Sequence, residues 1–230
     1  MDAPLHYAPA SQLESLEIWR GITPVSVGAE SLSGWVEANT RTTSFTNGEA
    51  FQNSGNVTAG VQSNGESWQS GIATNIANQT HSFRFMADKS EGDDREFQAD
   101  GDQTINATEH SKTHYGAGYG LNLGSNEIEF NYERHETDET GNPSLPSDII
   151  FLDTDIYSLK HRANLGELKV DSSVFHQSVD HEMDNFTLRP APNFNDNNAV
   201  PPPFLDEDRR EILVGSDTTG GDFSITQPLE

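Results

Sequence analysis

The sequence contains no cysteine and little positive charge, and each shortage excludes a class of protein. Without cysteine there can be neither a disulfide framework nor a cysteine-based zinc site. Only 13 Lys and Arg residues stand against 37 Asp and Glu residues, which gives a formal net charge of −24. Because such a charge repels phosphate backbones, nucleic acid is excluded as a partner. Cations and neutral ligands remain compatible with it.

Long apolar runs and catalytic signatures are also missing. Hydrophobic residues make up only 33% of the chain, and no run approaches the roughly 18 apolar residues of a membrane helix. The opening MDAPLHYAPA shows neither the basic nor the apolar region of a signal peptide. Gly-x-Ser-x-Gly, His-Glu-x-x-His and a phosphate-binding loop are absent, so the sequence predicts neither an enzyme nor a bound cofactor.

What the chain does contain is apolar residues at every second position, the pattern of half-exposed β-strands. Tyr115, Ala117, Tyr119 and Leu121 alternate with His or Gly, for example. Counting all such stretches predicts about eight strands, and a single short turn of helix is expected after Ser11. The alternating stretches lie at residues 57–62, 68–76, 82–88, 115–123, 128–133, 157–165, 168–174 and, more weakly, 211–214.

The expected connections differ greatly in length. Three are very short: 77–79, 124–126 and 165–166. Three are long and polar: 90–111, 136–152 and 182–208. In an antiparallel meander this alternation places the short turns at one end and the long loops at the other. The Asn64-Gly65 hairpin is a short connection at the loop end.

Two architectures fit this pattern, and three features favour a membrane barrel. The polar faces are charged and rich in Gly, the loop lengths are lopsided, and aromatic residues lie near strand ends (Trp68, Tyr115, Tyr132 and Tyr157). The alternative is a soluble, secreted, acidic β-sandwich that binds cations or glycans. A sandwich would pack the same apolar faces against a second sheet.

Residues 13–42, LESLEIWRGITPVSVGAESLSGWVEANTRT, resemble the end of the plug domain of a TonB-dependent outer-membrane receptor. The matching parts are residues 16–21, Pro24 with Gly28, and residues 33–41, with Ser33 where the family usually has Gly. The resemblance assigns the plug motif to Glu17, Arg20, Gly21, Gly28 and Gly34. The glycines permit tight turns, and Glu17 and Arg20 are expected to hold the plug to the barrel wall.

The resemblance implies an all-β fold, a partial transmembrane antiparallel β-barrel preceded by the end of a plug. Residues 1–43 would be the C-terminal part of the plug domain, and residues 44–230 the N-terminal part of the β-barrel domain. About eight strands of a larger up-and-down barrel would be present, so the chain is expected to be an internal piece of a receptor. No cofactor is implied.

Location, partners and cargo also follow from the resemblance. The protein would lie in the bacterial outer membrane, contact its lipid and work with a TonB-type energy-transducing complex through a missing N-terminal part. Its cargo would be a scarce ligand such as a metal ion or a metal chelate, for instance a siderophore. LPSDIIFLDTDIYSLKHR and DHEMDNFTLR are similar to segments of receptors for copper and other metals. Those receptors can use Cys and Met ligands, and this chain has no Cys and three Met.

The best candidate metal ligands are expected in a loop at the barrel mouth, because His, Met and carboxylates can all bind metals. The alternative is a solvated acidic loop. A second, weaker candidate is the pair His110 and His114, which would share one face of a strand. The loop candidates are His176, Asp180, His181, Met183 and Asp184.

Other charged residues are predicted to have structural roles. Arg84, Lys160 and Arg162 should project to the polar face, where they would pair with Glu127 or Glu129 or contact the plug. The acidic stretch 91–100 offers oxygen ligands for Ca²⁺ but lacks the EF-hand spacing. A solvated run of charge is the alternative for that stretch.

Overall fold

The computed structural model describes residues 13–22, 33–99, 101–191 and 209–227, which divide into two units at Thr42/Thr43. The regular elements of these residues are β-strands. In this part of the chain no helix is long and apolar enough to cross a membrane. The prediction of a helical turn after Ser11 is wrong for the described residues, because Leu13–Arg20 forms strand β1.

The first unit contains a two-stranded antiparallel hairpin. Strand β1 pairs with β2, Gly34–Thr40, so that Ile18 lies opposite Val36 and Trp19 opposite Trp35. Gly21 and Gly34 have positive φ angles of 84° and 125°. A Cβ atom at Gly34 would lie 2.6 Å from the Trp19 carbonyl oxygen, so only glycine fits there. Gly28 lies outside the described residues.

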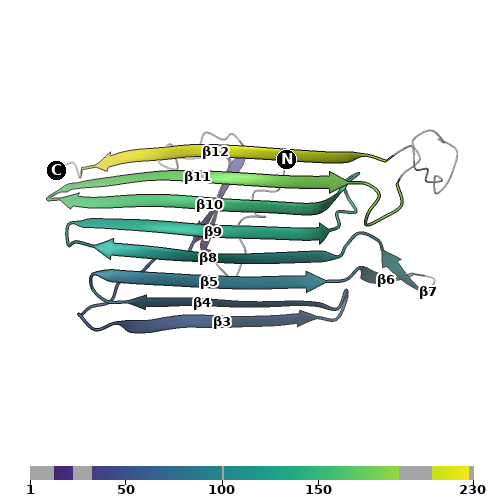
Figure 1. Ribbon diagram of the computed structural model, residues 1–230, viewed down its shortest axis with the longest axis horizontal. Coiled ribbons are helices and arrows are strands. Elements are labelled where there is room, and N and C mark those ends of the chain that lie inside the picture. Colours follow the sequence, from purple (N-terminus) through teal and green to yellow (C-terminus); the bar gives the residue numbers. More distant parts are fainter. Residues whose placement is uncertain (1–12, 23–32, 100, 192–208, 228–230) are drawn as a thin grey trace. The chain divides into compact units, whose positions relative to one another are not determined.

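The second unit contains one eight-stranded antiparallel sheet, in the order β12-β11-β10-β9-β8-β5-β4-β3 (Figure 1). Neighbours in space follow one another along the chain except where the small hairpin of β6 and β7 intervenes. The eight-stranded meander confirms the predicted fold class. The strands are β3 Gln52–Gln62, β4 Ser67–Ala77, β5 His81–Gly92, β6 Arg95–Ala99, β7 Gly101–Ile105, β8 His110–Asn122, β9 Asn126–Thr140, β10 Asp148–Leu165, β11 Leu168–Asp184 and β12 Glu211–Thr226.

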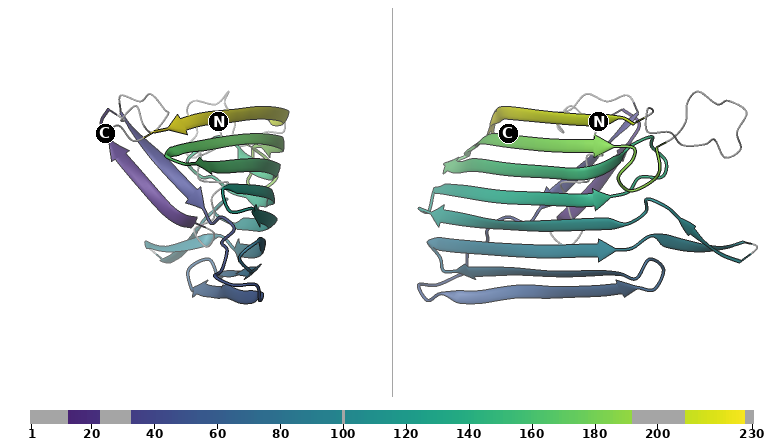
Figure 2. Two further views of the ribbon diagram at one scale, coloured as in Figure 1. Left: turned by 90° about the vertical axis from the view of Figure 1, so that its left-hand side faces the viewer. Right: turned by 45° about the vertical axis from the view of Figure 1, so that its right-hand side comes forward.

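Short turns join the strands at one end of the sheet, as predicted (Figure 1). Asn78 forms the β4–β5 turn: its Oδ1 accepts hydrogen bonds from the amides of Thr80 at 2.8 Å and His81 at 2.6 Å. The β10–β11 turn uses Gly166 at φ 71°. At the other end, the β6–β7 hairpin extends past the strands (Figure 2).

Two of the three long connections are shorter than predicted, because the strands run on into charged sequence. Strand β9 continues to Thr140 and β10 starts at Asp148, within the expected loop 136–152. Residues 90–111 contain the β6–β7 hairpin. The 18 residues of β10 span about 60 Å at about 3.4 Å each, more than twice the roughly 25 Å of a lipid-facing band. Backbone pairing needs no apolar side chains, so it continues where the alternation ends.

One face of the sheet is apolar and exposed. Phe85, Phe130 and Leu159 on this face are 49%, 45% and 49% exposed. The Tyr132 and Tyr157 rings lie side by side with centroids 5.0 Å apart. Beyond them, toward the long loops, the face becomes charged, and Arg134 forms an ion pair with Asp155 at 2.6 Å. A sandwich would bury these apolar residues, whereas here they form an exposed band bounded by tyrosines.

The opposite face is polar and carries most of the buried charged side chains, such as Arg84, His114 and Glu129. The segment Thr43–Thr46 crosses this face near the short turns. The Thr43 amide donates to Glu129 Oε1 at 3.2 Å, and Asn75 Nδ2 donates to the Ser44 carbonyl at 2.8 Å. A Cβ atom at Gly120 would lie 2.7 Å from Thr43 Oγ1, so glycine on β8 makes room for the crossing segment.

Candidate metal centre on the polar face

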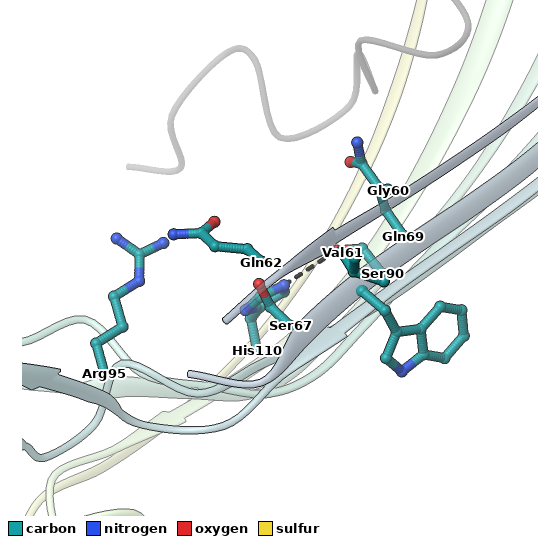
Figure 3. A pocket seen from close by; sticks show the side chains of 9 residues that line it. Gly60, Val61, Gln62, Ser67, Gln69, Ser90, Arg95 and His110 are labelled. Carbon is teal, nitrogen blue, oxygen red and sulfur yellow. Dashed lines mark hydrogen bonds between the residues drawn. The ribbon is translucent and has the colours of Figure 1, made fainter. Parts of the chain in front are cut away.

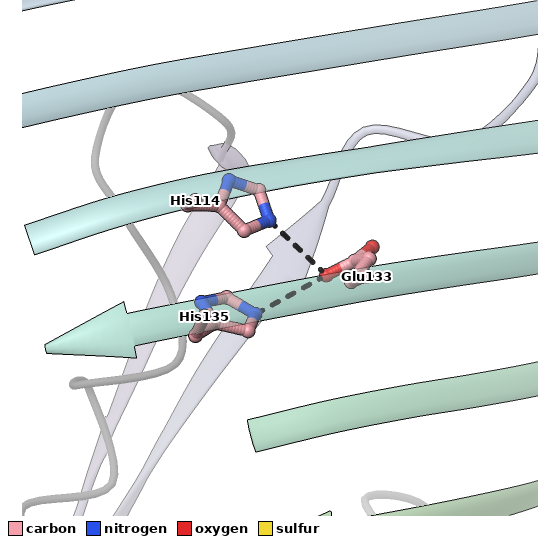
Figure 4. Close-up of side chains that lie close together, drawn as sticks. All are labelled: His114, Glu133 and His135. Atoms are coloured by element: carbon pink, nitrogen blue, oxygen red, sulfur yellow. Dashed lines mark ion pairs between the residues drawn. The ribbon is translucent and has the colours of Figure 1, made fainter. Parts of the chain in front are cut away.

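Three potential metal ligands meet on the polar face of two neighbouring strands (Figure 4). His114 lies on β8, directly opposite His135 on β9, and Glu133 precedes His135 by two residues on the same face. Cross-strand partners have Cβ atoms about 5 Å apart, and every second residue shares a face. The pairing of β8 with β9 therefore brings the three side chains together.

The geometry of this cluster is compact and buried. Glu133 Oε2 lies 3.8 Å from His114 Nε2 and 3.7 Å from His135 Nε2. One ligand atom from each residue lies within 4.8 Å of the others. The two imidazole rings stack with centroids 4.2 Å apart. His114 and His135 are 3% and 5% exposed, so water has little access to either ring.

Neighbouring side chains orient the cluster. Asp88 Oδ2, on β5, lies 2.9 Å from His114 Nδ1 and accepts a hydrogen bond from its N–H. This hydrogen bond leaves His114 Nε2 as the nitrogen with an available lone pair. The other carboxylate oxygen of Glu133 lies 3.7 Å from Arg84 Nη2, which also donates to Asn131 Oδ1 at 3.0 Å. Glu133 thus turns one oxygen to the histidines and the other to Arg84.

Charge also favours a cation here. Asp88 and Glu133 bring two carboxylates to this cluster. Arg84 brings one positive charge. Two imidazole nitrogens and one carboxylate oxygen form a donor set suited to Zn²⁺ or Cu²⁺.

The sequence-predicted ligands do not form a loop site, because they lie within strand β11. His176 and Asp180 face the apolar side, where His176 Nδ1 lies 2.9 Å from Thr219 Oγ1. His181 lies on the opposite face, paired with Leu152. Successive strand residues point to opposite faces, which separates these side chains. Met183 pairs with Ile149 near the strand end.

Asp184 is used as a structural acceptor. Its Oδ1 accepts from the amides of Phe186 at 3.0 Å and Thr187 at 2.9 Å, and its Oδ2 accepts from Thr187 Oγ1 at 2.5 Å. In the described residues, the group of three His, Asp or Glu side chains close enough to share a metal ion is instead His114, Glu133 and His135.

Sequence reasoning did not single out Glu133 or His135, and it paired His114 with His110 instead. His110 and His114 share a face, but four residues of a strand span about 13 Å. His110 Nε2 instead lies 3.0 Å from Ser90 Oγ. The β8–β9 turn fixes which residues face each other on the two strands. Leu123 pairs with Asn126, and counting the same number of residues outward from each of these two brings His114 opposite His135.

The predicted basic residues lie on the polar face. Arg162 Nη1 is 3.4 Å from Glu127 Oε1, as expected, and its Nε is 3.7 Å from Asp171 Oδ1. The ion pair of Arg84 is with Glu133, rather than with Glu127 or Glu129 as expected. Arg162 therefore connects β10 to its neighbours β9 and β11, whereas Arg84, on β5, reaches across β8 to Glu133 on β9.

A polar hollow of about 270 Å³ opens beside edge strand β3 (Figure 3). Within its lining, His110 Nε2 and Ser90 Oγ are joined by a hydrogen bond of 3.0 Å (Figure 3). Its other polar lining includes Gln62, Gln69 and Arg95. The lining contains one histidine and no carboxylate, so it lacks the donors of a metal site.

Two acids at the long-loop end, Asp94 and Glu109, share a partly buried contact. Asp94 Oδ1 accepts from the amides of Thr108 at 2.7 Å and Glu109 at 3.1 Å. Burial, the hydrogen bond with Asp94 and its negative charge raise the pKa of Glu109 to about 7. The Asp94 carboxylate therefore binds backbone amides of the same chain and does not serve as a calcium ligand.

This contact should weaken as pH rises. Glu109 has an ordinary pKa of 4.5, so its burial costs nothing below that pH, and the penalty grows until about pH 7. We expect hydrogen exchange at the Thr108 and Glu109 amides, corrected for intrinsic rates, to be faster at about pH 8 than at about pH 5. Glu109→Gln should abolish the difference, and Glu96→Gln, on β6, should leave it unchanged. Equal pH dependence in wild type and Glu109→Gln would contradict this account.

Comparison with known proteins places the sheet among β-barrel folds. No protein-family model and no curated protein sequence matches the chain. Among solved structures, a transporter barrel is similar over 100% of this chain, with a TM-score of 0.82.

That structure is the copper transporter OprC, with 19% sequence identity. At this identity the similarity shows the fold alone. The present chain covers 33% of the OprC chain, so it spans about one third of the length of the protein that it matches.

Proposed function

We propose that this chain is the end of the plug and the first part of the barrel wall of a TonB-dependent outer-membrane transporter. The transporter would take up a metal ion or a metal chelate. The observation that carries the proposal is the sheet with one exposed apolar face and one polar face. Lipid would cover the first face and the lumen the second, as in outer-membrane barrels.

Several further observations support this proposal. The fold is similar to that of a copper transporter. Tyr132 and Tyr157 lie where the apolar band meets charged residues, as in an aromatic girdle. The hairpin of β1 and β2 carries the plug-like residues Glu17, Arg20, Gly21 and Gly34, and Gly28 completes the motif in the sequence.

The proposed partners follow from that assignment. Lipid of the bacterial outer membrane would contact the apolar band. A TonB-type complex would supply energy through the part of the plug that precedes this chain in a whole receptor. The role would be transport rather than catalysis.

The lack of native cysteine allows a direct test of the two faces. Leu159 and Lys160 are successive residues of β10 on opposite faces. We expect a fluorophore at Leu159→Cys to be quenched by lipids that carry a quencher in their acyl chains. The same fluorophore at Lys160→Cys should instead be quenched by aqueous iodide.

The comparison is made with the 230-residue chain reconstituted in vesicles, where far-UV circular dichroism confirms β-structure. Equal access of both positions to iodide would contradict the lipid-facing assignment. This chain would then share the fold of a copper transporter without lying in a membrane.

A further inference from the structure

We propose that His114, Glu133 and His135 bind a first-row divalent metal ion, Zn²⁺ or Cu²⁺, on the polar face of the sheet. The ligand atoms would be His114 Nε2, His135 Nε2 and Glu133 Oε2. Binding rests on the geometry of the described residues. The inference that the bound ion would be cargo on its way through the barrel rests on the proposed function.

The spacing suits coordination better than direct hydrogen bonding. The separations from Glu133 Oε2 to the two histidines, 3.8 and 3.7 Å, exceed a hydrogen-bond length. Two ligands about 2.05 Å from a tetrahedral ion lie roughly 3.3 Å apart, so a small inward shift of each side chain would seat the ion. In the described structure, His114 Nε2 is buried and makes no hydrogen bond.

The surrounding groups have the arrangement of a supported metal site. Metal-bound histidines commonly donate their other ring N–H to a carboxylate, which fixes the tautomer and the ring orientation. Asp88 accepts from His114 Nδ1 in this way. Arg84 holds the second oxygen of Glu133 away from the histidines. The buried rings therefore have few alternative orientations.

The donor atoms also select among metals. Two nitrogens and one oxygen suit Zn²⁺ and Cu²⁺, whereas Cu⁺ prefers the sulfur of Cys and Met. The chain has no Cys, and the cluster contains no Met. Ca²⁺ and Mg²⁺ prefer six or more oxygen ligands, which three side chains with two nitrogens cannot supply.

Zinc titration of the 230-residue chain in detergent micelles tests the site. Isothermal calorimetry should show one Zn²⁺ per chain, and Co²⁺ in its place should give the visible absorption of a low-coordinate site. Excess Ca²⁺ should not displace either ion. Asp88→Asn should weaken Zn²⁺ binding about 10- to 100-fold, and His114→Ala or Glu133→Gln by more than about 100-fold.

His176→Ala is the matched control, because His176 is a histidine on the apolar face of the same sheet. It should leave Zn²⁺ affinity unchanged. Zn²⁺ binding that survives His114→Ala and Glu133→Gln, or that is lost with His176→Ala, would overturn the proposal. So would a wild-type chain with β-structure by circular dichroism that binds no Zn²⁺.

The two proposals can fail separately. Zinc binding that depends on His114, together with equal iodide access at Leu159 and Lys160, would support the site and reject the membrane assignment. A lipid-facing Leu159 in a chain that binds no zinc would support the membrane assignment and reject the metal site.

Discussion

Arg189→Met is expected to lower the free energy of unfolding by about 3 kcal/mol, because it leaves a buried carboxylate unpaired. Arg189 Nε lies 2.9 Å from Asp148 Oδ2, whose side chain is fully buried. Arg189 Nη2 also donates to the Leu145 carbonyl at 2.6 Å. Asp184 is the β11 neighbour of Asp148, so loss of the guanidinium leaves two buried carboxylates side by side.

Urea unfolding in micelles, followed by circular dichroism, measures this effect. The double variant Arg189→Met/Asp148→Asn should recover much of the lost stability, because the buried charge is gone. Arg162→Met is the matched control: its ion pairs are about half exposed, so it should cost no more than about 1 kcal/mol. If Arg189→Met lowers the free energy of unfolding no more than Arg162→Met does, the ion pair with Arg189 does not stabilise the buried Asp148.

The second large effect is expected at Phe130, in the middle of the apolar band. Phe130 lies between Tyr119 and Leu159 on the neighbouring strands and is 45% exposed. In a bilayer, Phe130→Arg should destabilise the folded chain by about 2–4 kcal/mol, because a charge then faces lipid. On a surface in water, such a substitution usually changes stability by less than about 0.5 kcal/mol.

Unfolding from vesicles separates these two environments. Leu123→Arg provides the control, because Leu123 is 59% exposed but lies in a short turn at the sheet end. It should cost about 0–1 kcal/mol, the range for charges near the membrane interface. Equal small costs at Phe130 and Leu123 would show that no lipid covers the apolar face.

Much of the fold was predictable because strand alternation and turn chemistry are local. Tyr115 through Leu121 reveal their strand without any knowledge of its neighbours. Asn78 and Gly166 mark turns because of their own hydrogen bonding and φ angle. The strand ends were not predictable, because Glu136 and Asp153 extend the sheet without adding apolar residues.

The candidate metal centre was harder to predict, because it depends on pairing between strands. His135 follows the stretch in which alternation was recognised, and a register error of one residue would place it opposite a different residue on β8. The loop candidates failed to converge for a related reason. Asp180 and His181 are adjacent in sequence, yet the extended backbone points them to opposite faces.

The crossing of the polar face by Thr43–Thr46 has a consequence for the order of folding. Its hydrogen bond from Thr43 to Glu129 joins residues 86 positions apart, whereas each hairpin of the meander pairs near neighbours. Contacts between distant residues incur a larger loop-closure cost before they stabilise the chain. Strands β8 and β9 should therefore pair before this segment settles over them, so the residues synthesised first in this unit reach their final place late.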